Sequence, residues 1–155
     1  MKPAAIEEIR AVLDDPAAAE DAFSCVAELI RSARDYTWVG IFRVNAGGIA
    51  IVSWSGPDEP AYPQFPVRQG LCEEAVRSAD TVLADDVTKD PRYLTTFSTT
   101  QSEIVVPVLD QETQAVLGLI DVESERANAL SEEDSVFLGE CATVLGQYWR
   151  LRAER

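Results

Sequence analysis

The chain has 155 residues, the length of one ordinary domain, and its 46% hydrophobic and 26% charged residues are typical of proteins that fold around their own core. Lys and Arg total 13 against 27 Asp and Glu, and the net charge of −14 argues against binding to nucleic acid phosphates or anionic lipid surfaces. The absence of histidine excludes imidazole general bases, Ser-His-Asp and Cys-His catalysis, His-ligated zinc and haem held by a proximal histidine.

The first part of the chain is predicted to form two helices. Residues 3–13 have the pattern of a short helix, and Asp15 before Pro16 resembles an N-cap followed by proline at the first position of a second helix. Cys25 lies between the apolar positions of that second helix, so we expect it in the core. Those positions recur at spacings of three and four and form one stripe: Ala19, Ala22, Phe23, Val26, Leu29, Ile30 and Ala33.

A β-hairpin is predicted next. Residues 36–44 and 49–55 are rich in β-branched and aromatic side chains, and the Asn-Ala-Gly-Gly segment at 45–48 supplies residues that tolerate a positive φ. The prolines that follow, at positions 57, 60, 63 and 66, exclude a helix and permit at most an edge strand at 62–67.

A second hairpin is predicted further along the chain. A short helix at 70–79 and a short strand at 81–83 lead into the polar stretch 85–101. That stretch is long for a structureless connection, and such loops are usually functional or mobile. Residues 104–109 and 115–122 are apolar and flank a polar turn, which makes them the clearest hairpin of the sequence.

A long helix is predicted to run close to the end. Ser131 is its N-cap, and Asp134 occupies the second position of a capping box. Its buried face carries Val136, Phe137, Cys141, Val144, Leu145, Tyr148 and Trp149. The order of elements favours an α+β fold, with a mainly antiparallel sheet and helices gathered on one side. We expect residues 1–155 to form one domain.

Cysteine usage and the N-terminal segment indicate where the protein works. Cys25, Cys72 and Cys141 are spaced too widely for a zinc motif and are too few for a secreted disulfide scaffold. Residues 1–20 lack the pattern of a signal peptide, and no apolar run approaches the roughly 20 residues that a membrane helix needs. We therefore predict a cytoplasmic protein with no metal site, no cofactor, and no membrane or nucleic acid partner.

Five segments of the sequence resemble the GAF domain family. The similarity spans roughly residues 20–150 and rests on YTWVGIF at 36–42, GLC at 70–72, SEIVVPV at 102–108, GLIDVES at 118–124 and LSEED at 130–134. More narrowly, the sequence resembles the stand-alone GAF proteins that reduce free methionine-R-sulfoxide. The resemblance implies about six antiparallel strands, with both terminal helices on one face and a loop-covered pocket on the other.

The resemblance also implies site residues. Glu103, Asp121 and Glu123 stand where the reductase family's carboxylates hold the ammonium group and polar head of the ligand, and Trp38 stands at the pocket aromatic. Independently of the resemblance, Asp121 and Glu123 are two apart on a strand and point to the same face. Burying both is costly unless a cation or hydrogen-bond donors pair with them. The alternative is that these carboxylates bond to loop amides or project into solvent.

The reductase family's cysteines are only partly retained. Its catalytic cysteine corresponds to Thr96 and a second cysteine to Tyr62, whereas a third is retained as Cys72. Sulfoxide reduction needs a thiolate that attacks sulfur and a second thiol that resolves the intermediate, and threonine cannot replace either. Cys72 opens the helix at 70–79, where the helix N-terminus could lower its pKa, or it is buried as a small apolar residue.

Other polar residues near the expected pocket are weaker candidates. Arg68, Lys89 and Arg92 could receive an anionic ligand. A hydroxyl-rich loop could supply hydrogen bonds to a polar ligand or could simply be solvated: Thr95, Thr96, Ser98, Thr99, Thr100 and Ser102.

Three functions remain open from the sequence. The first is a catalytically inactive module that senses or carries an amino-acid-like or other small polar ligand through Trp38, Tyr62, Thr96, Glu103, Asp121 and Glu123. The second is a divergent free methionine-R-sulfoxide reductase, an oxidoreductase that uses Cys72. The third is a homodimer formed through the terminal helices, with a vestigial pocket and with exposed apolar residues such as Trp149 and Leu151 at the interface.

Overall fold

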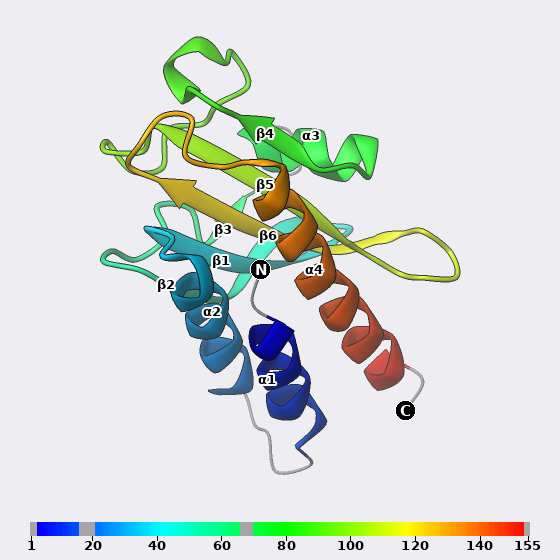
Figure 1. Cartoon of the computed structure of the whole chain (residues 1–155). Coiled ribbons are helices and arrows are strands. Elements are labelled where there is room, and N and C mark those ends of the chain that lie inside the picture. Colours follow the sequence, from blue (N-terminus) through cyan, green and yellow to red (C-terminus); the bar gives the residue numbers. More distant parts are fainter. Residues whose placement is uncertain (1–2, 16–20, 66–69, 154–155) are drawn as a thin grey trace.

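The computed structural model describes residues 3–15, 21–65 and 70–153 of the chain (Figure 1). The helices are α1 (Pro3–Asp14), α2 (Asp21–Arg34), α3 (Gly70–Ser78) and α4 (Glu132–Ala153), and a short 3₁₀ helix, η1, spans Val87–Lys89. The strands are β1 (Trp38–Asn45), β2 (Gly48–Ser55), β3 (Gln64–Phe65), β4 (Val82–Ala84), β5 (Ser102–Leu109) and β6 (Val116–Ser124). The predicted helix start at Pro16 and the stripe position Ala19 lie outside the described residues.

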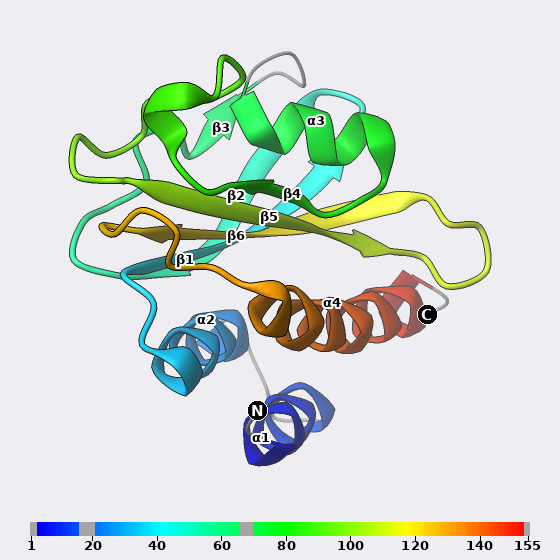
Figure 2. The ribbon, with the colours of Figure 1, turned by 45° about the horizontal axis from the view of Figure 1, so that its top comes forward.

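The six strands form one antiparallel sheet in the order β3-β2-β1-β6-β5-β4. The two predicted hairpins, β1–β2 and β5–β6, are joined along their long edges by the pairing of β1 with β6. Figure 2 shows α1, α2 and α4 on one face of this sheet, with α3 and the connection after β4 on the other. The predicted α+β class and six-stranded antiparallel sheet are therefore confirmed, and α3 is the helix that departs from the others.

Strand alternation sends apolar side chains into two cores, one on each face. On β1, Val39 and Ile41 pack beneath the three helices, whereas Trp38 and Phe42 face α3. On β6, Ile120 and Val122 also face the helices, so the alternate positions 119, 121 and 123 face the α3 side. This period of two is what brings acidic residues of β6 into the same layer as Trp38.

A hydrogen-bond network around Asp134 ties the start of α4 to the end of α2 and to the connection between α2 and β1. The Asp134 carboxylate accepts the Ser131 backbone N–H at 2.8 Å, the Tyr36 hydroxyl at 2.6 Å and the Arg34 Nε–H at 2.6 Å. The first of these bonds is half of the predicted capping box. Burial works to raise the pKa of Asp134, but the bonds from Tyr36, Ser131 and Arg34 outweigh it and hold that pKa below its ordinary value.

Two predictions of burial and one prediction of exposure are wrong. Cys25 is exposed, because it lies on the side of α2 that faces away from the sheet. Val136 is 45% exposed on the first turns of α4. Trp149, expected at an exposed dimer surface in one interpretation, is only 6% exposed, because its ring lies against Gly118, stacks on Phe23 and is covered by the Arg43 guanidinium. The prediction that Trp149 lies on the buried face of the terminal helix is correct.

None of the helices among the described residues is long and apolar enough to span a membrane.

Candidate functional site

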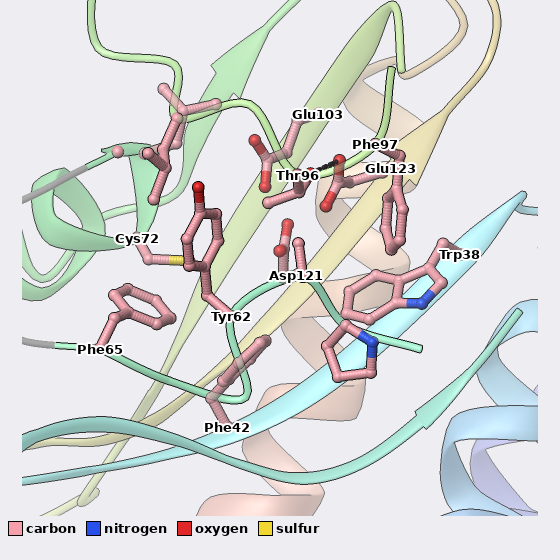
Figure 3. A pocket seen from close by; sticks show the side chains of 15 residues that line it. Trp38, Phe42, Tyr62, Phe65, Cys72, Thr96, Phe97, Glu103, Asp121 and Glu123 are labelled. Carbon is pink, nitrogen blue, oxygen red and sulfur yellow. Dashed lines mark hydrogen bonds between the residues drawn. The ribbon is translucent and has the colours of Figure 1, made fainter. Parts of the chain in front are cut away.

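A pocket opens between the sheet and the α3 side, and it contains all six residues that the sequence predicted for ligand binding (Figure 3). It encloses about 440 Å³ of empty space, its open mouth included. The predicted residues in its lining are Trp38, Tyr62, Thr96, Glu103, Asp121 and Glu123, and Cys72 lies beside them.

Strand register brings the three acids together. In the β5–β6 pair Glu103 lies directly opposite Glu123, and Asp121 follows two positions before Glu123 on the same face of β6. Trp38 of β1 lies opposite Glu123 on the other side of β6. Like charges directly opposite each other destabilise a sheet, so this arrangement costs stability in the absence of a counter-charge. Figure 3 shows the three carboxyl groups pointing into the same space, with Cys72 to one side and Trp38 to the other.

Two hydroxyl groups donate hydrogen bonds to Glu123, but only one of its two carboxylate oxygens has a partner among the described residues. Its Oε1 accepts Oγ1–H groups from Thr96 at 2.5 Å and from Thr100 at 2.9 Å. Its Oε2 is buried and has no hydrogen-bond partner among the described residues, although the side chain is almost fully enclosed. Burial raises the pKa of Glu123 to about 8, and the Asp121 charge adds to this effect while the two threonine bonds oppose it.

Glu103 and Asp121 form a coupled pair behind Glu123. Burial and the neighbouring acids raise the pKa of Glu103 well above its ordinary value, and burial also raises the pKa of Asp121. The two side chains interact directly: this contact raises the pKa of Glu103 and works against the rise in the pKa of Asp121. Asp121 Oδ1, like Glu123 Oε2, is buried without a partner in the part of the chain that the structure describes. Neither alternative from the sequence, exposure to solvent or pairing with loop amides, holds for these acids.

No Lys or Arg among the described residues lines the pocket. Lys89 is predominantly exposed and faces Asp86, whereas Arg92 makes a two-point contact with Asp90 at 2.9 and 2.6 Å, and both lie in a separate surface hollow after β4. Arg68 lies outside the described residues. The expectation of an anion-receiving residue at this pocket is therefore wrong for Lys89 and Arg92.

Aromatic rings close the pocket on the side of Glu123. The Trp38 indole lies against Phe97 with ring centroids 5.3 Å apart, and its Nε1–H donates to the Asp58 carbonyl at 3.1 Å. Gly40 and Gly56 leave room for this ring, because a Cβ at either position would overlap it. Sequence reasoning did not identify Phe97 as a site residue. Its position next to Thr96 in a polar loop was the only signal.

Cys72 is buried at the first turn of α3, on the opposite side of the acids from Trp38. Burial raises the pKa of the thiol well above its ordinary value, and the charges of Asp121, Glu103 and Glu123 act in the same direction. Of the two alternatives from the sequence, burial is therefore the one that the structure shows, and a pKa lowered by the helix N-terminus does not hold. In the ligand-free protein the thiol is protonated and forms part of the pocket lining.

The loop hydroxyls divide into two groups. Thr96 and Thr100 point inward to Glu123, whereas Ser102 donates to the Arg126 carbonyl at 2.7 Å and Thr99 is exposed. Thr95 and Ser98 are also exposed and do not line the pocket. The loop therefore supplies two specific hydroxyls to the site rather than a polar lip.

Comparison with known proteins gives a consistent result. The family model for the GAF domain matches residues 18–149. Among curated proteins, the chain is 26% identical over 121 residues to GAF domain-containing protein A of Dictyostelium discoideum, covering 77% of this chain and 74% of that protein. It is also 26% identical over 116 residues to the free methionine-R-sulfoxide reductase of Saccharomyces cerevisiae, covering 73% of this chain and 63% of that protein.

Two solved structures extend the similarity over almost the whole chain. The type II free methionine-R-sulfoxide reductase from Thermoplasma acidophilum is 28% identical with a TM-score of 0.77, covering 93% of this chain and 94% of that one. The free methionine-R-sulfoxide reductase from Neisseria meningitidis, solved in complex with its substrate, is 26% identical with a TM-score of 0.84, covering 94% and 86%. The resemblance found in the sequence is thereby confirmed.

Proposed function

This chain belongs to the GAF domain family, and we propose that it is a ligand-binding module whose pocket takes a small molecule bearing an ammonium group, of the amino-acid-like class. The observation that carries this proposal is the pair of buried carboxylate oxygens without partners, Asp121 Oδ1 and Glu123 Oε2. Buried polar oxygens are costly without a partner, and an ammonium group offers three N–H donors together with a positive charge that favours the ionised form of both acids.

The aromatic wall supports a cationic ligand as well. Trp38 and Phe97 border the same space as Glu123, and ring faces attract ammonium groups. Because the described part of the pocket lining contains no basic residue, nothing in it competes with the ligand for the acids. The relatives named free methionine-R-sulfoxide reductase act on an amino acid derivative, which belongs to the same ligand class.

We further propose that the module is catalytically inactive. Reduction of a sulfoxide to a thioether takes two electrons, which a pair of thiols gives by becoming a disulfide. Among the described residues, Cys72 is the only cysteine that lines the pocket. Cys141 is buried in the core under α4 and Cys25 is exposed on α2, so the sheet separates both from the pocket. Thr96, at the position that the resemblance gives to the catalytic cysteine, is instead engaged with Glu123.

A thermal-shift screen tests the binding proposal. Free amino acids, methionine sulfoxides among them, are compared with their deaminated counterparts, which have the same side chains but no ammonium group. A ligand at 100 times its Kd stabilises the folded state by about 2.7 kcal/mol, so we expect a clear rise in Tm with amino acids and none with the deaminated acids. Equal shifts with both series would contradict an acid-centred site.

The reductase remains the second candidate because Cys72 does lie in the pocket beside Glu103 and Asp121. With one pocket thiol, Cys72 would give both electrons to the sulfoxide and become a sulfenic acid. One external thiol would then condense with it to a mixed disulfide and release water, and a second external thiol would return Cys72 to the thiol. Thiol-dependent turnover of free methionine-R-sulfoxide, measured with wild type and Cys72→Ser, decides between the candidates. We expect no turnover above background in either protein, and turnover that disappears in Cys72→Ser would establish the enzyme.

A further inference from the structure

The inner end of the pocket gathers three side chains of the types that bind metal ions. The Cys72 sulfur, one Glu103 oxygen and one Asp121 oxygen all lie within 4.8 Å of one another. Zinc binds sulfur at about 2.3 Å and carboxylate oxygen at about 2.0 to 2.2 Å, so two donors on one ion lie at most about 4.5 Å apart. Shifts of these side chains by about 1 Å or less would therefore bring all three donors onto one ion.

The three donors come from rigid and separate elements. Cys72 lies in the first turn of α3, Glu103 on β5 and Asp121 on the neighbouring strand β6. Each side chain is buried, with exposed fractions of 7%, 4% and 3%. Because the backbone positions are fixed by the sheet and by the packing of α3 upon it, an ion would need to reorganise only side chains.

A second observation supports a cation site at this end of the pocket. Asp121 Oδ1 is buried and has no partner among the described residues, and the side chain points into the pocket between Cys72 and Thr96 (Figure 3). The two threonine hydroxyls that approach the acids donate to Glu123 instead. A buried carboxylate oxygen with no donor is a costly feature unless something absent from the protein itself completes it.

We propose that Cys72, Glu103 and Asp121 bind a thiophilic divalent cation of the zinc class, with its remaining coordination position open to the pocket. The donor set fits this class because a thiolate ligand favours zinc and cobalt over magnesium and calcium, which prefer oxygen ligands alone. Three protein ligands and one open position is the arrangement of zinc sites that accept an exogenous ligand. A thiolate and two carboxylates also outweigh the charge of the ion, so no further anion is required.

This site goes beyond the proposed ammonium site, although the two share Glu103 and Asp121. A bound ion and an ammonium ligand therefore compete for the same two carboxylates. Glu123 belongs to the ammonium site alone, and Cys72 belongs to the metal site alone. These two residues allow the failure of one proposal to be told apart from the failure of the other.

Cobalt titration of the full chain tests the metal site, because a cobalt–thiolate bond gives a near-ultraviolet charge-transfer band. The exposed Cys25 is first replaced by Ser, so that it cannot contribute. We expect the band to saturate at one cobalt ion per chain and to disappear when zinc is added. In the same background Cys72→Ala should abolish the band, whereas Cys141→Ala, the matched control for a buried thiol on the other face, should keep it.

Two further variants complete the test. Asp121→Asn should keep the cobalt–thiolate band but lower the affinity for cobalt by at least about tenfold. Even the loss of residues that only hydrogen-bond to metal ligands lowers metal affinity by that much. Glu123→Gln should leave cobalt binding unchanged. Circular dichroism checks that each variant is folded, and Glu103→Gln, with the same expected weakening, replaces Cys72→Ala if that protein does not fold. A band that survives Cys72→Ala, or no saturable band at one ion per chain, overturns the proposal.

Discussion

Asp121 and Asp134 are both aspartates with less than a twentieth of their surface exposed, yet their surroundings differ sharply. Asp134 accepts hydrogen bonds from Arg34 of α2, from Tyr36 in the connection to β1 and from Ser131 just before α4. Asp121 lies against the carboxyl group of Glu103, and one of its oxygens has no partner among the described residues. A buried acid that is left incomplete costs stability, and sites that cost stability are commonly the functional ones. The contrast therefore separates an acid that serves the fold from one that serves the pocket.

The first prediction is that Asp121→Asn stabilises the ligand-free protein. The amide removes one of three adjacent buried acids, and its NH₂ group can donate to the Glu103 carboxylate. We expect the free energy of unfolding to rise by about 1 kcal/mol, the net value of one hydrogen bond, in urea denaturation at neutral pH. A loss of stability in this variant would mean that Asp121 supports the fold, and it would remove the main argument for a cation in the pocket.

The residues of the site were predictable to different degrees. Glu103, Asp121, Glu123 and Trp38 could be placed at the pocket from the family resemblance, and strand periodicity agreed with it for Asp121 and Glu123. Phe97 could not, because its contact with Trp38 depends on how the connection after β4 folds back over the sheet. The grouping of Cys72 with Glu103 and Asp121 was missed for a similar reason, since spacing rules for metal sites look for ligands close in sequence.

At the level of elements, the Asp134 network fixes the start of α4 against the end of α2 and the connection that leads into β1. Asp134→Asn keeps the size of the side chain but loses the charge that Arg34 and the capped helix N-terminus favour. We expect a destabilisation of about 2 kcal/mol, in the range found for hydrogen bonds to charged groups. Thermal or urea unfolding at pH 7 measures it, and a change within error would show that the network adds no stability.

This contribution depends on pH in a defined direction. Because the pKa of Asp134 in the folded protein is held below the unfolded value of about 3.9, its stabilisation is fully present above that pH. It is lost as the pH falls through the folded pKa. The difference in unfolding free energy between wild type and Asp134→Asn should therefore be constant above about pH 5 and should shrink at lower pH. A difference that grows on acidification would contradict the assignment.

Element boundaries followed from local sequence, whereas exposure along helices did not. The strands β1, β2, β5 and β6 lie within two residues of their predicted bounds, because alternation and turn residues mark their ends. Cys25 and Val136 were placed on buried faces because each adjoins an apolar stripe. A helix that packs on a sheet through only part of its surface leaves such flanking positions in solvent.

At the scale of the whole molecule, the sheet divides the three thiols. Cys72 is on the α3 side, and Cys25 and Cys141 are on helices of the other face. We predict that a thiol reagent modifies one cysteine rapidly in the native protein, Cys25, and all three after denaturation. Mass spectrometry of the labelled peptides identifies the site. Rapid native labelling of Cys72 would show that the pocket opens more than the structure indicates.

The homodimer predicted through the terminal helices stays a prediction, with a smaller apolar surface than expected. Trp149 is buried, and the large apolar side chains that stay exposed on the described part of α4 are Val136 and Leu151. We expect any dimer of this type to depend on Leu151 and to dissociate in Leu151→Asp, as measured by light scattering. Val136→Asp, at the other end of the same helix, is the matched control. A dimer that persists in Leu151→Asp would place the interface elsewhere.

The chain carries a large negative charge, and the described lining of the pocket contains no Lys or Arg that could pair with the acids. We therefore expect the ligand to supply the positive charge. The most direct test is isothermal titration calorimetry of an amino acid found by the thermal-shift screen, with wild type, Glu123→Gln and Glu140→Gln. Glu140 is an exposed acid of α4 on the opposite face of the sheet. The account predicts that Glu123→Gln weakens binding at least about tenfold, which corresponds to about 1.4 kcal/mol, while Glu140→Gln binds as wild type does. Equal affinity in Glu123→Gln and wild type would contradict it.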